Sequence, residues 1–167
     1  MLAANPGDVI TTAQLEAFGR AVESLGGRYV TAEDVGMSEA RMQVVATQTR
    51  HVSGLPVGEG SAGGDPGPFT AMGIYRGVKA AAKRALGADD MKGVHVAIQG
   101  IGSVGGGLAK LLAKDGARLT IADVDQNRVA QFASELGAET ADPTAILGIE
   151  ADIVSPNALG AVLTEGT

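Results

Sequence analysis

The sequence predicts an open α/β fold in which parallel strands alternate with helices. From Val94 onward, short apolar runs alternate with stretches of helical spacing, and this order is typical of parallel strands joined by crossover helices. A stretch rich in Gly and Pro at 53–68 separates this region from the residues before it. Such composition is typical of a loop or hinge, so the chain is expected to form two units.

The residues before this stretch predict two helices and one short strand, at 13–25, 38–45 and 28–34. Thr12 is a candidate N-cap of the first helix, and Ser38 of the second, because short hydroxyl side chains can accept from unpaired N–H groups of a first helical turn. These elements are expected to form a small first unit.

The residues after it predict helices at 69–86, 103–114 and 126–136, a helical turn at 143–147, strands at 94–98, 118–122 and 152–155, and a short segment at 138–139. Gly87, Gly116 and Gly137 follow the three helices, and glycine is common directly after a helix C-terminus. Strands joined through helices in this way pair in parallel.

Composition excludes several classes of function. The formal charge is −6, aromatic residues are scarce and no block of Lys and Arg is present, so nucleic-acid binding is not expected. The chain contains no cysteine, which suits the reducing cytoplasm. His51 and His95 are isolated, so no metal site is expected, and His95 is interpreted as a hydrogen-bonded core residue. Neither a signal peptide nor a membrane-spanning segment is expected.

Gly100, Gly102 and Gly105 form a G-x-G-x-x-G pattern at the junction of a predicted strand and helix. Asp123 ends the next predicted strand, roughly 20 residues further on. The pattern alone is weak, but the strand before it, the helix after it and the acidic residue are all in place. Together they predict a Rossmann-type dinucleotide-binding site.

Each residue of this pattern has an expected role. Gly100 permits the tight turn, Gly102 lets the pyrophosphate approach the backbone, and Gly105 lets the helix pack closely. Backbone N–H groups at the helix start, at Ser103 and Val104, are expected to face the phosphates.

Asp123 is expected to accept hydrogen bonds from the adenine ribose, and its charge disfavours a 2′-phosphate, so NAD is the predicted cofactor. Arg128 could receive such a phosphate but is interpreted as part of a solvated helix face. Gly106 and Gly107 each cost a helix roughly 1 kcal/mol relative to Ala, and they are expected to relieve crowding against the sheet.

Four segments carry a resemblance to a known family: "GGRYVTAEDVG" at 26–36, "TRHVSGLP" at 49–56, "GGDPGPFTAMGIYRGVKAAAK" at 63–83 and "SPNALGAVL" at 155–163. Together they resemble the Glu/Leu/Phe/Val amino-acid dehydrogenase family, and most of all its leucine, valine and phenylalanine branch. The resemblance implies a doubly wound parallel sheet, here incomplete, preceded by a remnant of an α/β substrate and dimerisation domain. The implied domains are 1–54, the end of the substrate domain, and 55–167, the NAD-binding domain without its last strands.

The resemblance implies NAD-dependent oxidative deamination of a branched-chain or aromatic L-amino acid to its 2-oxo acid and ammonia, by a homo-oligomer. It matches Asp34 to the catalytic aspartate, although from the residues alone an Asp that caps the following turn is the simpler interpretation. It matches Thr70 to a threonine near the nicotinamide carboxamide, and Asn157 and Ala158 to the loop that passes the nicotinamide.

One alternative stays open at this stage. In the family, a Gly-rich segment with a catalytic lysine lies upstream of the motif "AEDVG", and this chain begins after that point. A non-catalytic NAD-binding module or fragment is therefore the competing hypothesis.

Overall fold

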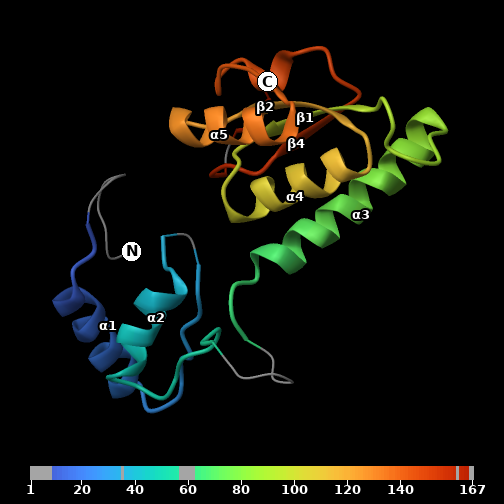
Figure 1. The fold of residues 1–167 in the computed structure, drawn as a ribbon. Helices are drawn as coiled ribbons and strands as arrows, with labels where there is room; N and C mark the ends of the chain where they lie inside the picture. Colours follow the sequence, from blue (N-terminus) through green and yellow to red (C-terminus); the bar gives the residue numbers. More distant parts are fainter. Residues whose placement is uncertain (1–8, 35, 57–62, 161, 166–167) are drawn as a thin grey trace. The chain divides into compact units, whose positions relative to one another are not determined.

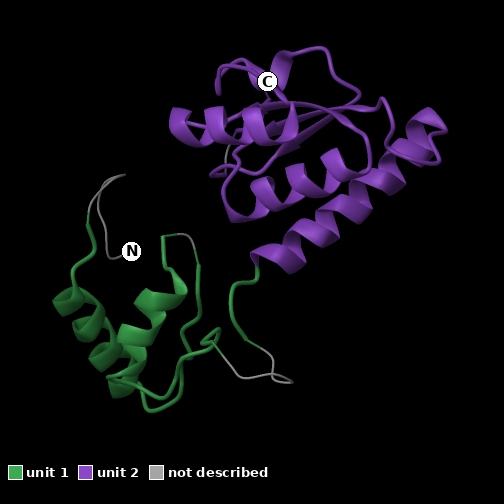
Figure 2. Cartoon of the chain, in the orientation of Figure 1, with its two compact units in different colours: residues 1–66 green, residues 67–167 purple. Residues whose placement is uncertain are grey.

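The computed structural model describes residues 9–34, 36–56, 63–160 and 162–165 of the chain (Figure 1). The chain divides into two compact units, Met1–Pro66 and Gly67–Thr167 (Figure 2). The division at 66/67 lies further along the chain than the predicted domain boundary at 54/55, near the end of the Gly- and Pro-rich stretch at 53–68. Within that stretch, 57–62 lie outside the described residues. The assignment of the first unit to a substrate domain stays a prediction.

The first unit contains two packed helices, α1 (Thr12–Ser24) and α2 (Glu39–Ala46). Its buried apolar side chains are Leu15, Val22, Met42 and Val45. The predicted N-cap of α1 is wrong by one residue, because Thr11 accepts from the backbone N–H of Gln14 and the Gln14 side chain reaches back to Thr11. This reciprocal pair fixes the start of α1. Ser38 caps α2 as predicted.

The predicted strand at 28–34 is wrong. Among the described residues of this segment, only Thr31 pairs as a strand residue, in one isolated parallel bridge with Val52. The Thr31 N–H donates to the His51 carbonyl over 3.0 Å, and the Ser53 N–H donates to the Thr31 carbonyl over 2.7 Å. A strand requires a continuous ladder of such bonds, and a single bridge does not form one. The apolar side chains of Tyr29 and Val30 are exposed, so they do not pack in a core as strand residues would.

The second unit contains a parallel sheet of β1 (His95–Gln99), β2 (Arg118–Ala122), β3 (Glu139–Thr140) and β4 (Ile153–Pro156). The strand order is β3-β2-β1-β4, and every neighbouring pair is parallel. The predicted α/β class with a parallel sheet is therefore confirmed. The chain runs from β1 outward to β3 and then returns to place β4 on the other side of β1. The order thus reverses beside β1, and in open α/β sheets ligands bind at the carboxyl ends of the strands at such a point.

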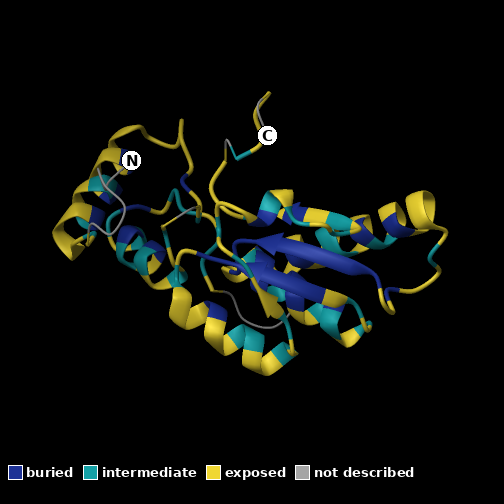
Figure 3. Cartoon of the chain, turned by 90° about the horizontal axis from the view of Figure 1, so that it is seen from above, coloured by how far each residue is buried: buried dark blue, intermediate teal, exposed yellow. Residues whose placement is uncertain are grey.

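Three helices pack on one face of this sheet: α3 (Gly67–Leu86), α4 (Ser103–Lys114) and α5 (Gln126–Leu136). Figure 3 shows the central strands buried. The opposite face carries a smaller cluster of Ala97, Ala122 and Ile146, the last from a 3-10 turn at Ile146–Gly148. His95 is buried as predicted, with its ring between the Thr120 hydroxyl and the Arg118 guanidinium, each 2.8 Å away.

Candidate dinucleotide-binding site

The loop that follows β1 is held tightly at its first glycine. Gly100 has a φ of +83°, a conformation that a residue with a Cβ rarely adopts. Its N–H donates to the Ala122 carbonyl at the end of β2 over 2.7 Å. A Cβ at Gly100 would stand 2.8 Å from the Ala158 nitrogen and 2.9 Å from the Asn157 carbonyl carbon. Position 100 therefore requires glycine both for its backbone conformation and for the space available.

Gly105 brings the first turn of α4 against the same loop. A Cβ there would lie 1.9 Å from the Gly100 carbonyl oxygen and 3.2 Å from the Asn157 Cβ. Asn157 is fixed in turn, because its N–H donates to the Gln99 carbonyl over 2.6 Å and its amide donates to the Ser155 carbonyl over 2.9 Å. The structure thus brings four of the predicted site residues together: Gly100, Gly105, Asn157 and Ala158.

Gly102 differs from both neighbours in the pattern, because the space in front of it is open. It is the exposed N-cap of α4, and a Cβ built on it would meet no described atom within 4 Å. The first N–H groups of α4, starting at Ser103 and Val104, follow directly and point toward the N-terminal end of the helix. An uncrowded glycine beside a helix N-terminus fits the pyrophosphate of a dinucleotide.

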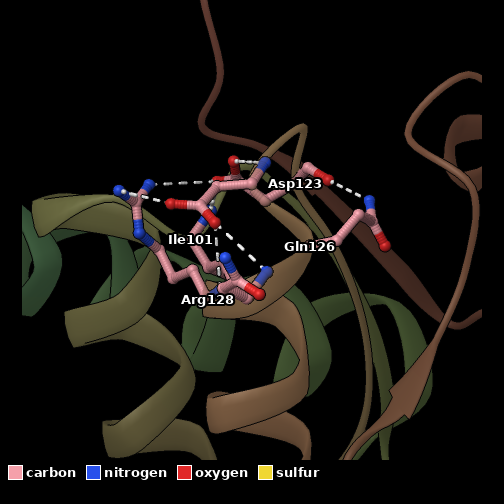
Figure 4. Close-up of polar contacts among 6 residues, drawn as sticks. Ile101, Asp123, Gln126 and Arg128 are labelled. Atoms are coloured by element: carbon pink, nitrogen blue, oxygen red, sulfur yellow. Dashed lines mark hydrogen bonds and ion pairs between the residues drawn. The ribbon is translucent and has the colours of Figure 1, made fainter.

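Asp123 lies at the end of β2 with its carboxylate beside this loop (Figure 4). The residue is only 9% exposed. Its Oδ2 accepts from the Ile101 N–H over 2.8 Å, and its Oδ1 accepts from the Asp125 N–H over 3.0 Å. Two backbone donors therefore fix a buried carboxylate where the adenine ribose of a bound dinucleotide is expected. The sequence pattern predicted Asp123 but not its bond to Ile101, which joins the two halves of the pattern.

Arg128 lies beside Asp123 (Figure 4), although the sequence favoured a solvated helix face. Its guanidinium lies 3.6 Å from the Asp123 carboxylate and 3.4 Å from that of Asp125. Its side chain is 42% exposed, so it is solvated on one side and paired with acids on the other. Asp125 is the N-cap of α5, and its i,i+3 spacing to Arg128 was the signal in the sequence that could have indicated this pair.

Gly106 and Gly107 make room for neighbouring helices. The prediction that they relieve crowding against the sheet is wrong. A Cβ at Gly106 would stand 2.8 Å from the Phe132 ring of α5, and a Cβ at Gly107 would stand 3.0 Å from the Ala71 Cβ of α3. The two glycines therefore let α4 approach α5 on one side and α3 on the other. Their cost in helix propensity is offset by this close packing.

An open hollow of about 480 Å³ lies beside the glycine-rich loop, between α4 and α5. The residues that line it include Gly102, Ser103, Lys110, Arg128, Gln131 and Phe132. The Lys110 ammonium lies 5.2 Å from the centre of the Phe132 ring and 3.1 Å from Glu135. Two cationic side chains, Lys110 and Arg128, therefore line the same hollow as Gly102.

Thr70 and Asp34 are the two remaining predicted residues. Thr70 is exposed in the first turn of α3, next to Ala71, the residue that faces Gly107. Asp34 is exposed in the first unit, and its backbone carbonyl accepts from the Met37 N–H over 2.8 Å. That bond closes a turn through the backbone and does not involve the Asp34 carboxylate, so its capping role and its catalytic role both stay predictions.

Among the described residues, no group of three or more His, Cys, Asp and Glu side chains is placed to hold a metal ion. The described helices include none that is both long and apolar enough to cross a bilayer.

No protein-family model matches the chain. Among curated proteins, the chain is 44% identical to leucine dehydrogenase of Geobacillus stearothermophilus over 93% of its own length and 42% of that protein. It is 41% identical to valine dehydrogenase of Streptomyces virginiae, over 90% of its length and 43% of that protein. The chain thus spans about two fifths of the length of the curated relatives it matches.

A solved structure of a related enzyme has a similar fold. The crystal structure of L-tryptophan dehydrogenase from Nostoc punctiforme aligns with a TM-score of 0.66 at 32% identity, covering 94% of this chain and 43% of that one. The sequence comparison and the structure comparison therefore both cover nearly all of the chain and both match it to amino-acid dehydrogenases. Over the part of their length that it spans, this chain is a homologue of the leucine, valine and tryptophan dehydrogenases.

Proposed function

We propose that this chain binds NAD and takes part in the oxidative deamination of a branched-chain or aromatic L-amino acid. The observation that carries the proposal is the contact between the Ile101 N–H and the Asp123 carboxylate, 2.8 Å long. It places a fixed anion beside a glycine-rich loop whose second glycine faces open space. Homologues named leucine, valine and tryptophan dehydrogenase support the reaction class.

In this proposal the cofactor is held at three places: the pyrophosphate, the adenine ribose and the nicotinamide half. The N–H groups that open α4 donate to the pyrophosphate, which approaches over Gly102. The Asp123 carboxylate accepts from the hydroxyls of the adenine ribose, and its charge opposes a 2′-phosphate. NAD is therefore preferred to NADP. Thr70 and the loop at Asn157 and Ala158 contact the nicotinamide half.

The proposed reaction converts an L-amino acid, water and NAD⁺ into a 2-oxo acid, ammonium, NADH and a proton. A bound NAD would supply the acceptor for the hydride that leaves the amino acid Cα. Asp34 is the proposed acid and base: its carboxylate takes a proton from the substrate ammonium and releases it to solvent, and later takes a proton from the attacking water and passes it to the leaving amine. Catalysis by Asp34 distinguishes this proposal from a module that binds NAD without reacting.

Calorimetric titration of the chain with NADH tests the binding site. Gly102→Val is expected to abolish binding, because the two methyl groups would occupy the open space reserved for the pyrophosphate. Gly148→Val is the matched control, since a Cβ at Gly148 also meets no described atom within 4 Å and lies outside the loop. Unchanged NADH affinity in a folded Gly102→Val protein would place the phosphates elsewhere.

The reaction is tested by following NADH formation with L-leucine, L-valine, L-phenylalanine and L-tryptophan. Turnover that Asp34→Asn reduces by about 100-fold or more, with NADH affinity unchanged, would support general acid-base catalysis. Tight NADH binding without turnover of any of these amino acids would favour the non-catalytic module.

A homo-oligomer and a cytoplasmic location, where amino acids and NAD are both available, complete the proposal. The exposure of Phe69 and Met72 on α3, 79% and 37%, supports self-association, because exposed apolar side chains often mark protein contacts. A monomer in sedimentation at micromolar concentration would contradict it.

A further inference from the structure

We propose that the hollow between α4 and α5 is a subsite for a phosphate on the 2′-oxygen of the adenine ribose, with Arg128 as the residue that recognises it. The chain would then bind NADPH as well as NADH, though less tightly. This inference rests on the proposed function, because it assumes that Asp123 holds the adenine ribose.

The position of Arg128 follows from that of Asp123. If the Asp123 carboxylate accepts from the ribose hydroxyls, a substituent on the 2′-oxygen begins at that carboxylate. The Arg128 guanidinium lies 3.6 Å from Asp123 Oδ2. Arg128 also lines the hollow together with Gly102 and Ser103, where the pyrophosphate of the cofactor is expected. A 2′-phosphate would therefore meet Arg128 directly.

The charge of the hollow suits a phosphate. Of the described residues that line it, Lys110 and Arg128 are cationic and none is acidic. Arginine presents a planar fork of N–H donors that matches the oxygens of a phosphate, and such charge-assisted bonds are short and strong. Lys110 is already placed over Phe132 and beside Glu135, so it contributes mainly a second positive charge.

The present ion pairs of Arg128 leave it able to turn toward a ligand. Its distances to Asp123 and Asp125, 3.6 Å and 3.4 Å, exceed those of a charge-assisted hydrogen bond, about 2.7–2.9 Å. The Arg128 side chain is 42% exposed, and exposed ion pairs contribute little to stability. A phosphate can therefore replace the acids as its partner at small cost.

Asp123 does not depend on Arg128 for its position. The backbone N–H groups of Ile101 and Asp125 already hold both carboxylate oxygens, at 2.8 Å and 3.0 Å. Loss of the Arg128 side chain should therefore leave the ribose contacts of NADH in place. If loss of the Arg128 side chain weakens NADPH binding and leaves NADH binding nearly unchanged, Arg128 contacts the 2′-phosphate.

The test is calorimetric titration of the full chain with NADH and with NADPH, for the wild-type protein, Arg128→Ala and Arg84→Ala. Arg84 is an exposed cation in the last turn of α3 and gives the same change of charge outside the hollow. Arg128→Ala is expected to weaken NADPH binding about tenfold and NADH binding less than threefold, as for one charge-assisted contact. Arg84→Ala should change neither, and circular dichroism checks that each variant is folded.

A second variant makes the result sharper. Asp123→Asn removes the charge that repels the phosphate and competes for Arg128, so NADPH should bind more tightly in it. Arg128→Ala should then cost more NADPH affinity in this background than in the wild type. NADH binding without measurable NADPH binding, or equal losses for both dinucleotides in Arg128→Ala, would overturn the subsite and leave the NAD site standing. Failure to bind either dinucleotide would overturn the proposed function itself.

Discussion

The backbone N–H of Ile101 donates a hydrogen bond to the carboxylate of Asp123 over 2.8 Å, although 22 positions separate the two residues. This bond joins the glycine-rich loop after β1 to the end of β2. Asp123 is therefore a structural residue of the loop as well as a candidate ligand of the ribose. Unfolding measures the first role, and dinucleotide affinity measures the second.

Replacement of Asp123 by Ala should destabilise the second unit by about 1–3 kcal/mol, because it leaves the N–H groups of Ile101 and Asp125 without their acceptor. Asp123→Asn should cost less, since its amide oxygen can still accept one of the two bonds. Urea unfolding followed by circular dichroism gives the comparison. Equal stability of Asp123→Ala and the wild type would mean that water replaces the carboxylate fully.

Replacement of Asp123 by Ser should narrow the difference between the affinities for NADH and NADPH. The shorter neutral side chain loses hydrogen bonds to the ribose and also the charge that opposes a 2′-phosphate. Dissociation constants of both dinucleotides are the measurement. A wild-type chain that binds NADPH as tightly as NADH would contradict the expected preference before any variant is made.

Replacement of Gly105 by Ala should destabilise the second unit by about 3 kcal/mol or more, because the new Cβ would overlap the Gly100 carbonyl oxygen at 1.9 Å. Gly102→Ala is the matched control, since it adds the same methyl group where no described atom lies within 4 Å. Thermal melts of the two variants should therefore differ widely. Similar melting temperatures would show that α4 can shift away from the loop.

Acid should weaken the contact between α3 and α4 at Asp115. The Lys79 ammonium donates to the Asp115 carboxylate over 2.6 Å and the Tyr75 hydroxyl donates to it over 2.5 Å. These bonds, that of Lys79 first, lower the pKa of Asp115, and the bond to Asp115 raises the pKa of Lys79. Because the folded-state pKa of Asp115 is depressed, its stabilisation is present above the unfolded value of about 3.9 and is lost as the pH falls through the folded value.

Urea unfolding midpoints at about pH 6 and about pH 3 measure this loss. Asp115→Asn should lower the midpoint near neutral pH and show a smaller further decline in acid than the wild type. Asp89→Asn is the control, because Asp89 pairs with Lys83 on the surface with 86% of its side chain exposed. An acid decline in Asp115→Asn as large as in the wild type would assign the effect to other carboxylates.

Local signals predicted most of the second unit correctly. The bounds of α4, β2 and α5 are as predicted, since residues near each end determine them: Asp125 caps α5, and Gly137 follows it with a φ of +63°. The segment 28–34 has the composition of a strand, but strand formation depends on a partner. Only Thr31 pairs with another segment, at Val52. The local sequence does not indicate which of these residues pairs with a distant segment.

The candidate site was predictable to the same extent. The spacing singles out Gly100, Gly102, Gly105 and Asp123, because phosphate and ribose binding requires these residue types at these places, and their binding roles stay predictions. The partners of Asp123 and the acid contacts of Arg128 do not follow from spacing, since they arise where a loop and a helix meet in space. The same holds for Gly106 and Gly107, whose neighbours belong to α5 and α3.

The three consecutive glycines of α4 have an evolutionary consequence. Gly105, Gly106 and Gly107 face three different neighbours: the Gly100 carbonyl, the Phe132 ring and the Ala71 methyl group. Position 105 faces backbone, so selection should hold it as glycine in any lineage that keeps this loop. Position 107 faces a side chain, and position 106 faces the Phe132 ring first, with the Ile101 carbonyl oxygen 3.1 Å from a Cβ there. A slightly larger residue at either position therefore requires residue 132 or residue 71 to become smaller. Divergent relatives should therefore show paired, compensating changes of side-chain size between 106 and 132 and between 107 and 71, and none that involves 105.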